Sequence, residues 1–299
     1  AFGRKGEGDA EWAEVEAAAQ RQTRAPWLEN RSRVLSGWMG VLESGTEHDD
    51  YRFRRAAFLR VGQGHGHGHC DTLDLQFYAH GLPMTLDGGA RPGYSSPPDT
   101  ASRVHNVVEV DGKNWLTHSW VTALTDSEGA RYLAARAEPP RSMPGVTYHG
   151  RQVALIDVDE GRGSRRLAPA ELLPGFNRLD AGVTTPNSYL FDVARVSGGA
   201  LHTYCFHGPC KDDAYAVNAL ERRPVGELDA ASQEYLRRFP RPERAFGGVA
   251  PETVVATWRY PRAPDSNAAN GCEQHMAMFP WNDAVPRKFT RLHLLGQAG

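Results

Sequence analysis

Histidines concentrate in one glycine-rich stretch of this chain, residues 64–69, which reads GHGHGH. His65, His67 and His69 are separated by single residues, so in an extended chain their side chains point to the same side. Imidazole binds metal ions and, because its charge changes near neutral pH, it also acts as a general acid or base. This stretch is therefore the strongest candidate for chemistry in the sequence.

Two further groups with ligand chemistry follow it. Asp87 lies in the segment MTLDGG and His105 in the segment SRVHNVV. Together with one of the earlier histidines they could hold zinc as a His/Asp/His set with water in the fourth position. Two other interpretations stay open on the residues alone: a Gly/His loop that binds metal only adventitiously, and core histidines that are bonded to backbone groups.

The elements that must position these residues are short β-type runs. From Val34 onward, apolar and β-branched stretches such as YRFRRAAFLRVG, HNVVEVDG and FTRLHLLG alternate with Gly, Pro, Asp and Asn. This pattern predicts a mainly β chain that forms a large antiparallel β-sandwich. The three histidines share the parity of Leu73, Leu75 and Phe77, which predicts one core-facing row that ends at the edge of a sheet.

Two local features complete the organisation. The segment RVSGGALHTY predicts a hairpin whose turn is Ser-Gly-Gly. Residues 8–22, GDAEWAEVEAAAQRQ, predict a helix. We therefore expect a helical lead-in over residues 1–33 and a sandwich over 34–299, with a charged insertion or crossover near 209–248.

The chain begins without Met or an apolar signal region, so we expect a processed, truncated or incomplete start.

Composition excludes some partners. The formal net charge is −2, which argues against nucleic-acid binding by bulk electrostatics, so an acidic substrate must be recognised locally. No apolar run approaches the roughly 18 residues that would suggest a membrane span. We therefore expect neither a nucleic-acid partner nor a membrane segment.

Two ordered blocks resemble the C-terminal domain of the heparinase II/III-like polysaccharide lyases. The first is HGHCDTLDLQFYAHGLPMTLDGG followed by RVHNVVEVDG, and the second is NSYLFDVARVSGGALHTYCFHG. The resemblance covers residues 34–208, and two ordered blocks are more specific than one short motif. It implies a β-sandwich of that type and the cleavage of a uronic-acid-containing polysaccharide, such as alginate or a glycosaminoglycan, by β-elimination.

The resemblance also implies roles for individual residues. His69, Asp87 and His105 would hold a structural zinc, while His67 would point into the catalytic cleft. Tyr94 would lie at the edge of that cleft as a second catalytic residue.

Two further residues would be in reach of substrate. His65 is either a substrate contact or a plain loop histidine. Asn106 could bind sugar or could equally tie down a turn.

In relatives, the principal Tyr and another His come from an (α/α) toroid that precedes the sandwich. The resemblance thus implies a toroid domain or chain as partner, of which residues 8–22 would be a remnant, and a periplasmic or secreted location. A different function class is also open: a non-catalytic, zinc-stabilised module for carbohydrate binding or subunit contact, which would stack sugars on Trp115, Trp120 and Tyr94.

Overall fold

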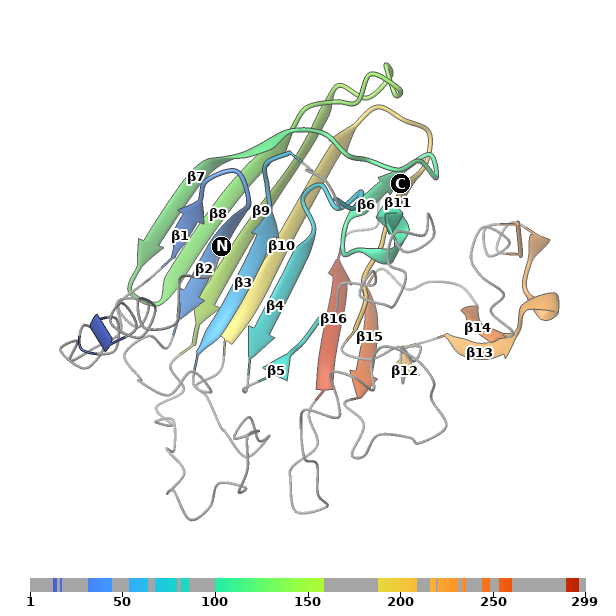
Figure 1. The fold of residues 1–299 in the computed structure, drawn as a ribbon. Coiled ribbons are helices and arrows are strands. Elements are labelled where there is room, and N and C mark those ends of the chain that lie inside the picture. Colours follow the sequence, from blue (N-terminus) through green and yellow to red (C-terminus); the bar gives the residue numbers. More distant parts are fainter. Residues whose placement is uncertain are drawn as a thin grey trace, which may run out of the picture.

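The regular structure in the described part of this chain is almost entirely β. The computed structural model describes residues 13–14, 17, 32–44, 54–63, 68–79, 82–85, 100–158, 188–208, 216–218, 220–230, 233–234, 244–247, 253–259 and 289–295. Within these ranges the strands form antiparallel sheets, as Figure 1 shows. The mainly β prediction is confirmed.

Two large sheets dominate the fold. The first has the order β1-β2-β3-β4-β5, with strands at Arg33–Leu35, Met39–Ser44, Arg55–Arg60, Leu75–Ala79 and Leu82–Pro83. The second has the order β10-β9-β8-β7, with β7 at Ser119–Ser127, β8 at Ala130–Ala137, β9 at Tyr148–Asp157 and β10 at Ser188–Ser197.

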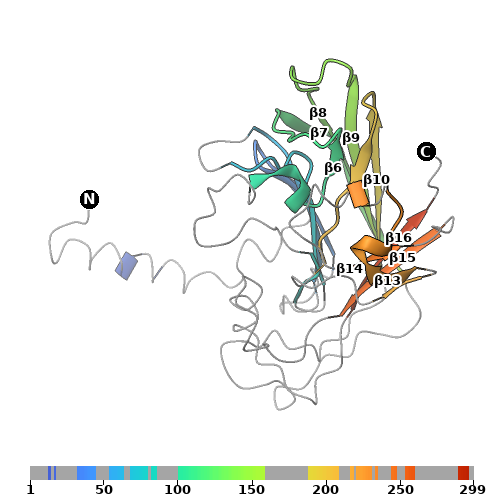
Figure 2. The same ribbon diagram turned by 90° about the vertical axis from the view of Figure 1, so that its right-hand side faces the viewer.

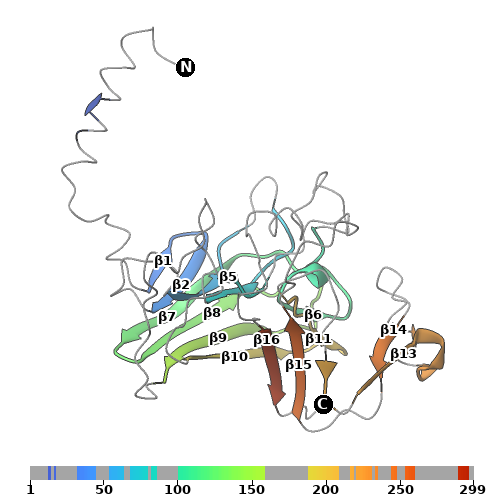
Figure 3. The ribbon, with the colours of Figure 1, turned by 90° about the horizontal axis from the view of Figure 1, so that it is seen from below.

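These two sheets pack face to face and enclose one core. Side chains of the first sheet and of the loops at its end meet side chains of β8 and β9, and the two layers are visible in Figure 3. The core residues are Leu42, Ala57, Leu59, Val61, Leu73, Leu75, Leu133, Ala135, Ala137, Val153 and Leu155. Alternate residues of β8 and β9 supply this core, as expected for strands with one buried face. The predicted sandwich is thereby confirmed.

Smaller elements lie around the sandwich (Figure 2). They are the pair β6 (Val108–Val110) and β11 (His202–Tyr204), the sheet of β12 (Ala216–Val217), β15 (Thr253–Arg259) and β16 (Phe289–Leu295), the pair β13 (Glu221–Pro224) and β14 (Arg244–Gly247), and the 3₁₀ turns η3 (Ser102–Val104) and η5 (Val225–Glu227). In the described part of the chain, no helical segment has the length and apolarity of a membrane span.

The predicted hairpin at RVSGGALHTY is wrong. β10 pairs with β9, whereas β11 pairs with β6, so the two strands belong to different sheets. Gly198 and Gly199 both have positive φ, 89° and 86°, and they redirect the chain instead of folding it back. A side chain at Gly198 would collide with the backbone oxygen of Gly145. Asp111 Oδ1 fixes the new direction by accepting the amide protons of Ala200 and Leu201, each at 2.8 Å.

The predicted core-facing row is confirmed for Leu73, Leu75 and Phe77, which pack in the core, but it does not extend as a strand back to His69. β4 begins only at Leu75, and Leu73 has φ 60°, in the left-handed region. One residue in that conformation breaks the two-residue period of a strand, so parity does not carry from residue 69 to residue 75. The segment before β4 is instead irregular.

Trp115 is a core residue and not an exposed platform for sugar. It is 2% exposed and packs in a second cluster with Val110, Met143 and Val146. Its Nε1 donates to Thr117 Oγ1 at 2.7 Å. The polar end of the indole is therefore satisfied inside the fold, and the prediction that Trp115 stacks on sugars is wrong.

His149 makes the fold sensitive to acid. It lies on the buried face of β9 against Trp115, with ring centroids 4.4 Å apart, and it is 1% exposed. Burial, with the nearby Arg151 cation, lowers the pKa of His149 from 6.5 to about 4. The unfolded chain therefore binds a proton between pH 6.5 and 4 that the folded chain does not, and stability is lost as the pH falls through this window, by about 3 kcal/mol in full.

We expect the free energy of unfolding of His149→Phe to fall less than that of wild type between pH 7.5 and 4.5. Urea unfolding at the two pH values measures the difference, with the exposed His118→Phe as control. Equal losses in wild type and His149→Phe would contradict this prediction.

Candidate functional site

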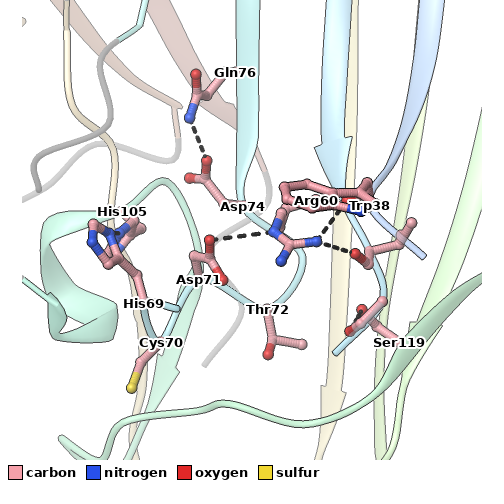
Figure 4. Close-up of polar contacts among 12 residues, drawn as sticks. Trp38, Arg60, His69, Cys70, Asp71, Thr72, Asp74, Gln76, His105 and Ser119 are labelled. Atoms are coloured by element: carbon pink, nitrogen blue, oxygen red, sulfur yellow. Dashed lines mark hydrogen bonds and ion pairs between the residues drawn. The ribbon is translucent and has the colours of Figure 1, made fainter. Parts of the chain in front are cut away.

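Two of the predicted zinc ligands meet although 36 residues separate them. His69 Nδ1 lies 3.0 Å from His105 Nε2, and the two rings meet edge to face with centroids 5.1 Å apart (Figure 4). His105 is fully buried, at 0% exposure, whereas His69 is half-buried. Of the two residues, only His69 is accessible to solvent.

His105 is held in the tautomer that a metal ligand needs. Its Nδ1 lies 2.8 Å from the carbonyl oxygen of Ala101, which can only accept, so Nδ1 carries the proton. In the neutral ring Nε2 then has a lone pair directed at His69. A backbone carbonyl that fixes the second nitrogen in this way is the usual support of a metal-binding histidine.

The two segments that carry these histidines are tied together by their backbones. Cys70 N donates to Thr100 O at 2.8 Å, and Ser102 Oγ donates to Cys70 O at 2.8 Å. Ser102 Oγ also accepts the amide proton of Trp115 at 2.8 Å. The short turn η3, which His105 directly follows, is thus attached to the segment that carries His69. Backbone and serine hydrogen bonds therefore hold the two rings near each other, in addition to the contact between the rings.

The donor set fits zinc as far as it is described. Two imidazole nitrogens 3.0 Å apart are close to the roughly 3.3 Å that two ligands of a tetrahedral zinc adopt. Among the described residues no group of three His, Cys, Asp or Glu side chains forms a metal site. The third predicted ligand, Asp87, lies outside the described residues, as do the predicted cleft residues His65, His67 and Tyr94.

Asn106 is fully buried and bonds to two other segments. Its side-chain oxygen accepts the amide proton of His207 at 2.6 Å. Its backbone amide donates to Asp74 Oδ1 at 2.6 Å. Asn106 thus joins the start of β4 to the segment after β11, while its two predicted roles, a sugar contact or a tie at a turn, stay predictions.

A buried arginine, which sequence reasoning did not find, supports the same region. Arg151 of β9 is 2% exposed, and its Nη1 donates to the carbonyl oxygens of Leu73, at 2.7 Å, and of Asn106. Its Nε and Nη2 donate to the carboxylate of Asp192 at 2.8 and 2.7 Å, and Tyr204 OH donates to the same carboxylate at 2.7 Å. Arg151 thereby connects β10 and β11 to the residues that flank the histidine site.

Arg151 stays charged at neutral pH. Burial lowers the pKa of Arg151, but Asp192, Tyr204 and Asp74 together outweigh burial and the net shift is upward. Burial raises the pKa of Tyr204, and Asp192 raises it further, so the phenol stays protonated. The sequence pattern of β9 does not set Arg151 apart, and its partner Asp192 is 41 positions away in the sequence.

The chain was compared with known proteins in three ways. No family model and no curated protein matches it. Solved structures to which the chain is similar include heparan sulfate lyase HepC from Pedobacter heparinus, with 19% identity over 48% of this chain and 24% of that chain, at a TM-score of 0.37. A heparinase III gene product matches with 14% identity over 85% of this chain and 32% of that one, at a TM-score of 0.45.

A further structure, of heparinase III, matches with 12% identity over 40% of this chain and 19% of that chain, at a TM-score of 0.32. The chain spans at most about a third of the length of these proteins.

Proposed function

We propose that this chain is the sandwich side of a polysaccharide lyase that cleaves a uronic-acid-containing polymer, such as alginate or a glycosaminoglycan, by β-elimination. One observation carries the proposal. The resemblance of the sequence blocks implies that His69 and His105 act together, and these two side chains, far apart in sequence, lie 3.0 Å apart. An unrelated chain with a chance similarity in two short motifs would have no reason to bring these nitrogens together.

The proposed reaction needs three steps: neutralisation of the uronate carboxylate, removal of the proton at C5, and protonation of the leaving oxygen O4. In this proposal His67 is the base or the partner of the carboxylate, because a histidine can exchange a proton near neutral pH. Tyr94 stands at the cleft edge, where a phenol can give or take a proton. The remaining groups would come from a helical toroid, as a domain or a separate chain.

Zinc has a structural part in the proposal. His69, Asp87 and His105 would hold it, and it would pin the irregular segment before β4 to the turn η3. The bound zinc would fix the position of His69, and with it the backbone two residues from His67. The ring of His67 would itself stay free to contact substrate. A polymer that is too large to cross a membrane also leads us to propose a periplasmic or secreted location.

The activity test is the formation of an unsaturated uronate. The full-length protein, incubated with alginate, heparin, heparan sulfate and a neutral glucan, is expected to produce new ultraviolet absorbance with at least one acidic polymer and none with the glucan. Binding of an acidic polymer without any product would favour the non-catalytic module. Absence of both binding and product on all acidic polymers would refute the lyase proposal.

The metal test is independent of the substrate. Protein purified without added metal is expected to contain about one zinc per chain by elemental analysis. Chelation should lower the melting temperature, because ligands from separate segments bind the ion only in the folded chain. The control is His202→Ala, which removes an exposed histidine that is not one of the proposed zinc ligands. The ring of His202 is hydrogen-bonded to the carbonyl oxygen of Gly198, and its loss should leave the zinc content unchanged. A metal-free preparation of equal stability would contradict the prediction.

A further inference from the structure

An exposed tryptophan stands on the turn between β1 and β2. Trp38 is 62% exposed, which is unusual for the largest apolar side chain. The guanidinium carbon of Arg60 lies 5.5 Å from the centroid of its ring, a cation–π contact that supports the indole from one side. The ring is thus held in place while most of its surface stays open to solvent.

Arg60 is itself fixed in position. Its Nη1 donates to the carbonyl oxygens of Trp38, at 2.7 Å, and of Val61, and its Nε lies 3.4 Å from Asp71 Oδ2. In the described part of the chain Nη2 has no partner. One edge of the guanidinium is therefore used for positioning, and one nitrogen remains available to an anion.

This pair lies beside the histidine site. Arg60 is the last residue of β3, and the chain continues from it into residues 64–67, where His65 and His67 are found. Its partner Asp71 follows His69 by two residues, and Figure 4 shows Asp71 between the histidine pair and the stacked Arg60 and Trp38. Trp38, Arg60 and Asp71 therefore lie at the same end of the sheet as His69.

We propose that Trp38 and Arg60 form a binding subsite for one acidic sugar residue of the polysaccharide. The indole would stack on the C–H face of the pyranose ring, and Arg60 Nη2 would pair with a carboxylate or sulfate of the same residue. The subsite deepens the proposed lyase function and rests on it for the identity of the polymer. It also supplies local recognition of an acidic ligand by a chain whose formal net charge is −2.

A protein partner is the competing occupant, because Val34 and Leu35 are exposed on the neighbouring strand β1. The contacts that orient Arg60, with Asp71 and two carbonyl oxygens, favour an acidic sugar as the ligand. An apolar protein contact needs no guanidinium oriented by a carboxylate and two carbonyl groups, whereas an anionic sugar does.

The experiment measures the affinity of the full-length protein for an alginate hexasaccharide, a heparan sulfate hexasaccharide and a neutral cellohexaose by titration calorimetry. Trp38→Ala is expected to raise the Kd for the better acidic probe roughly tenfold, as for loss of one stacking contact. Trp38→Phe should restore part of the affinity. KM should rise in parallel with Kd while kcat changes little, because Trp38 and Arg60 are proposed to bind the sugar and not to transfer protons.

The charge is tested separately. Arg60→Gln is expected to weaken binding of the acidic probe, to reduce its dependence on salt, and to leave binding of cellohexaose unchanged. Arg60→Lys keeps the charge and should retain part of the affinity, which separates this effect from a change in folding.

Matched controls lie on the second sheet. Arg136→Gln removes an arginine 5.0 Å from the ring of Tyr148, a similar pair at another place, and Tyr189→Ala removes an exposed aromatic of β10. Both should bind the probes as wild type does.

The outcomes separate the two proposals. Cleavage by wild type together with unchanged Kd and KM in Trp38→Ala and Arg60→Gln would overturn the subsite and leave the lyase standing. Binding that depends on Trp38 and Arg60, without product from any polymer, would support the subsite and remove the lyase. A change of oligomeric state in Trp38→Ala at unchanged affinity would overturn the subsite in favour of a protein contact, and so would the lack of binding to either acidic probe.

Discussion

Asp192→Ala is expected to destabilise the fold by about 3–5 kcal/mol, because it leaves the buried guanidinium of Arg151 without its carboxylate. Arg151 is almost completely inaccessible to water, and the carboxylate of Asp192 accepts from both its Nε and its Nη2. Tyr204 would lose the same acceptor. Urea unfolding at pH 7 measures the loss.

A double variant tests the cause. Arg151→Met combined with Asp192→Leu removes both charges, so we expect it to recover much of the stability that Asp192→Ala loses. Arg131→Met is the control, since Arg131 also pairs with a carboxylate, Asp157, in the same sheet but is more accessible to water, and its loss should cost less. If the double variant is no more stable than Asp192→Ala, the uncompensated charge is not the cause.

His67→Ala is expected to lower turnover by on the order of 10²-fold or more in the full-length enzyme, as for loss of a general acid or base. The melting temperature should change little, because His67 is proposed to face substrate and not the metal. The measurement is the initial rate of unsaturated product formation on the polymer that the activity test identifies.

His69→Ala should behave differently although it lies only two residues away. Its Nδ1 is directed at His105 Nε2, so its removal should lower zinc content and melting temperature together. The control is His118→Ala, which removes an exposed histidine that stacks on Trp120. It should change neither the zinc content nor the melting temperature. Near-normal turnover of His67→Ala, or equal behaviour of the His67 and His69 variants, would contradict the prediction that His67 is catalytic and His69 binds zinc.

The sequence alone determined which residues form strands and which histidines belong together. Most of the predicted β-type runs are strands or adjoin them, because alternating apolar residues and polar turns act within a few residues. The pairing of His69 with His105 followed from the resemblance of the first motif block, which contains both residues, and the structure brings the two rings together. The roles of Asp87, His65, His67 and Tyr94 stay predictions.

The tertiary structure alone decided the partners of those strands and the surroundings of the site. β11 pairs with β6 and not with β10, because two consecutive glycines with positive φ redirect the chain, and the sequence SGG fits a hairpin turn equally well. Parity failed at residues 69–75 because Leu73 is in the left-handed region, which no apolar pattern predicts.

The same holds for burial. Trp115 lies in the core and Trp38 lies in solvent, although both are tryptophans between β-type runs. Arg151 is buried because Asp192, Tyr204 and two backbone oxygens from distant segments surround it. Such contacts join residues that are tens of positions apart, so they depend on how the sheets pack, whereas strand patterns depend only on near neighbours.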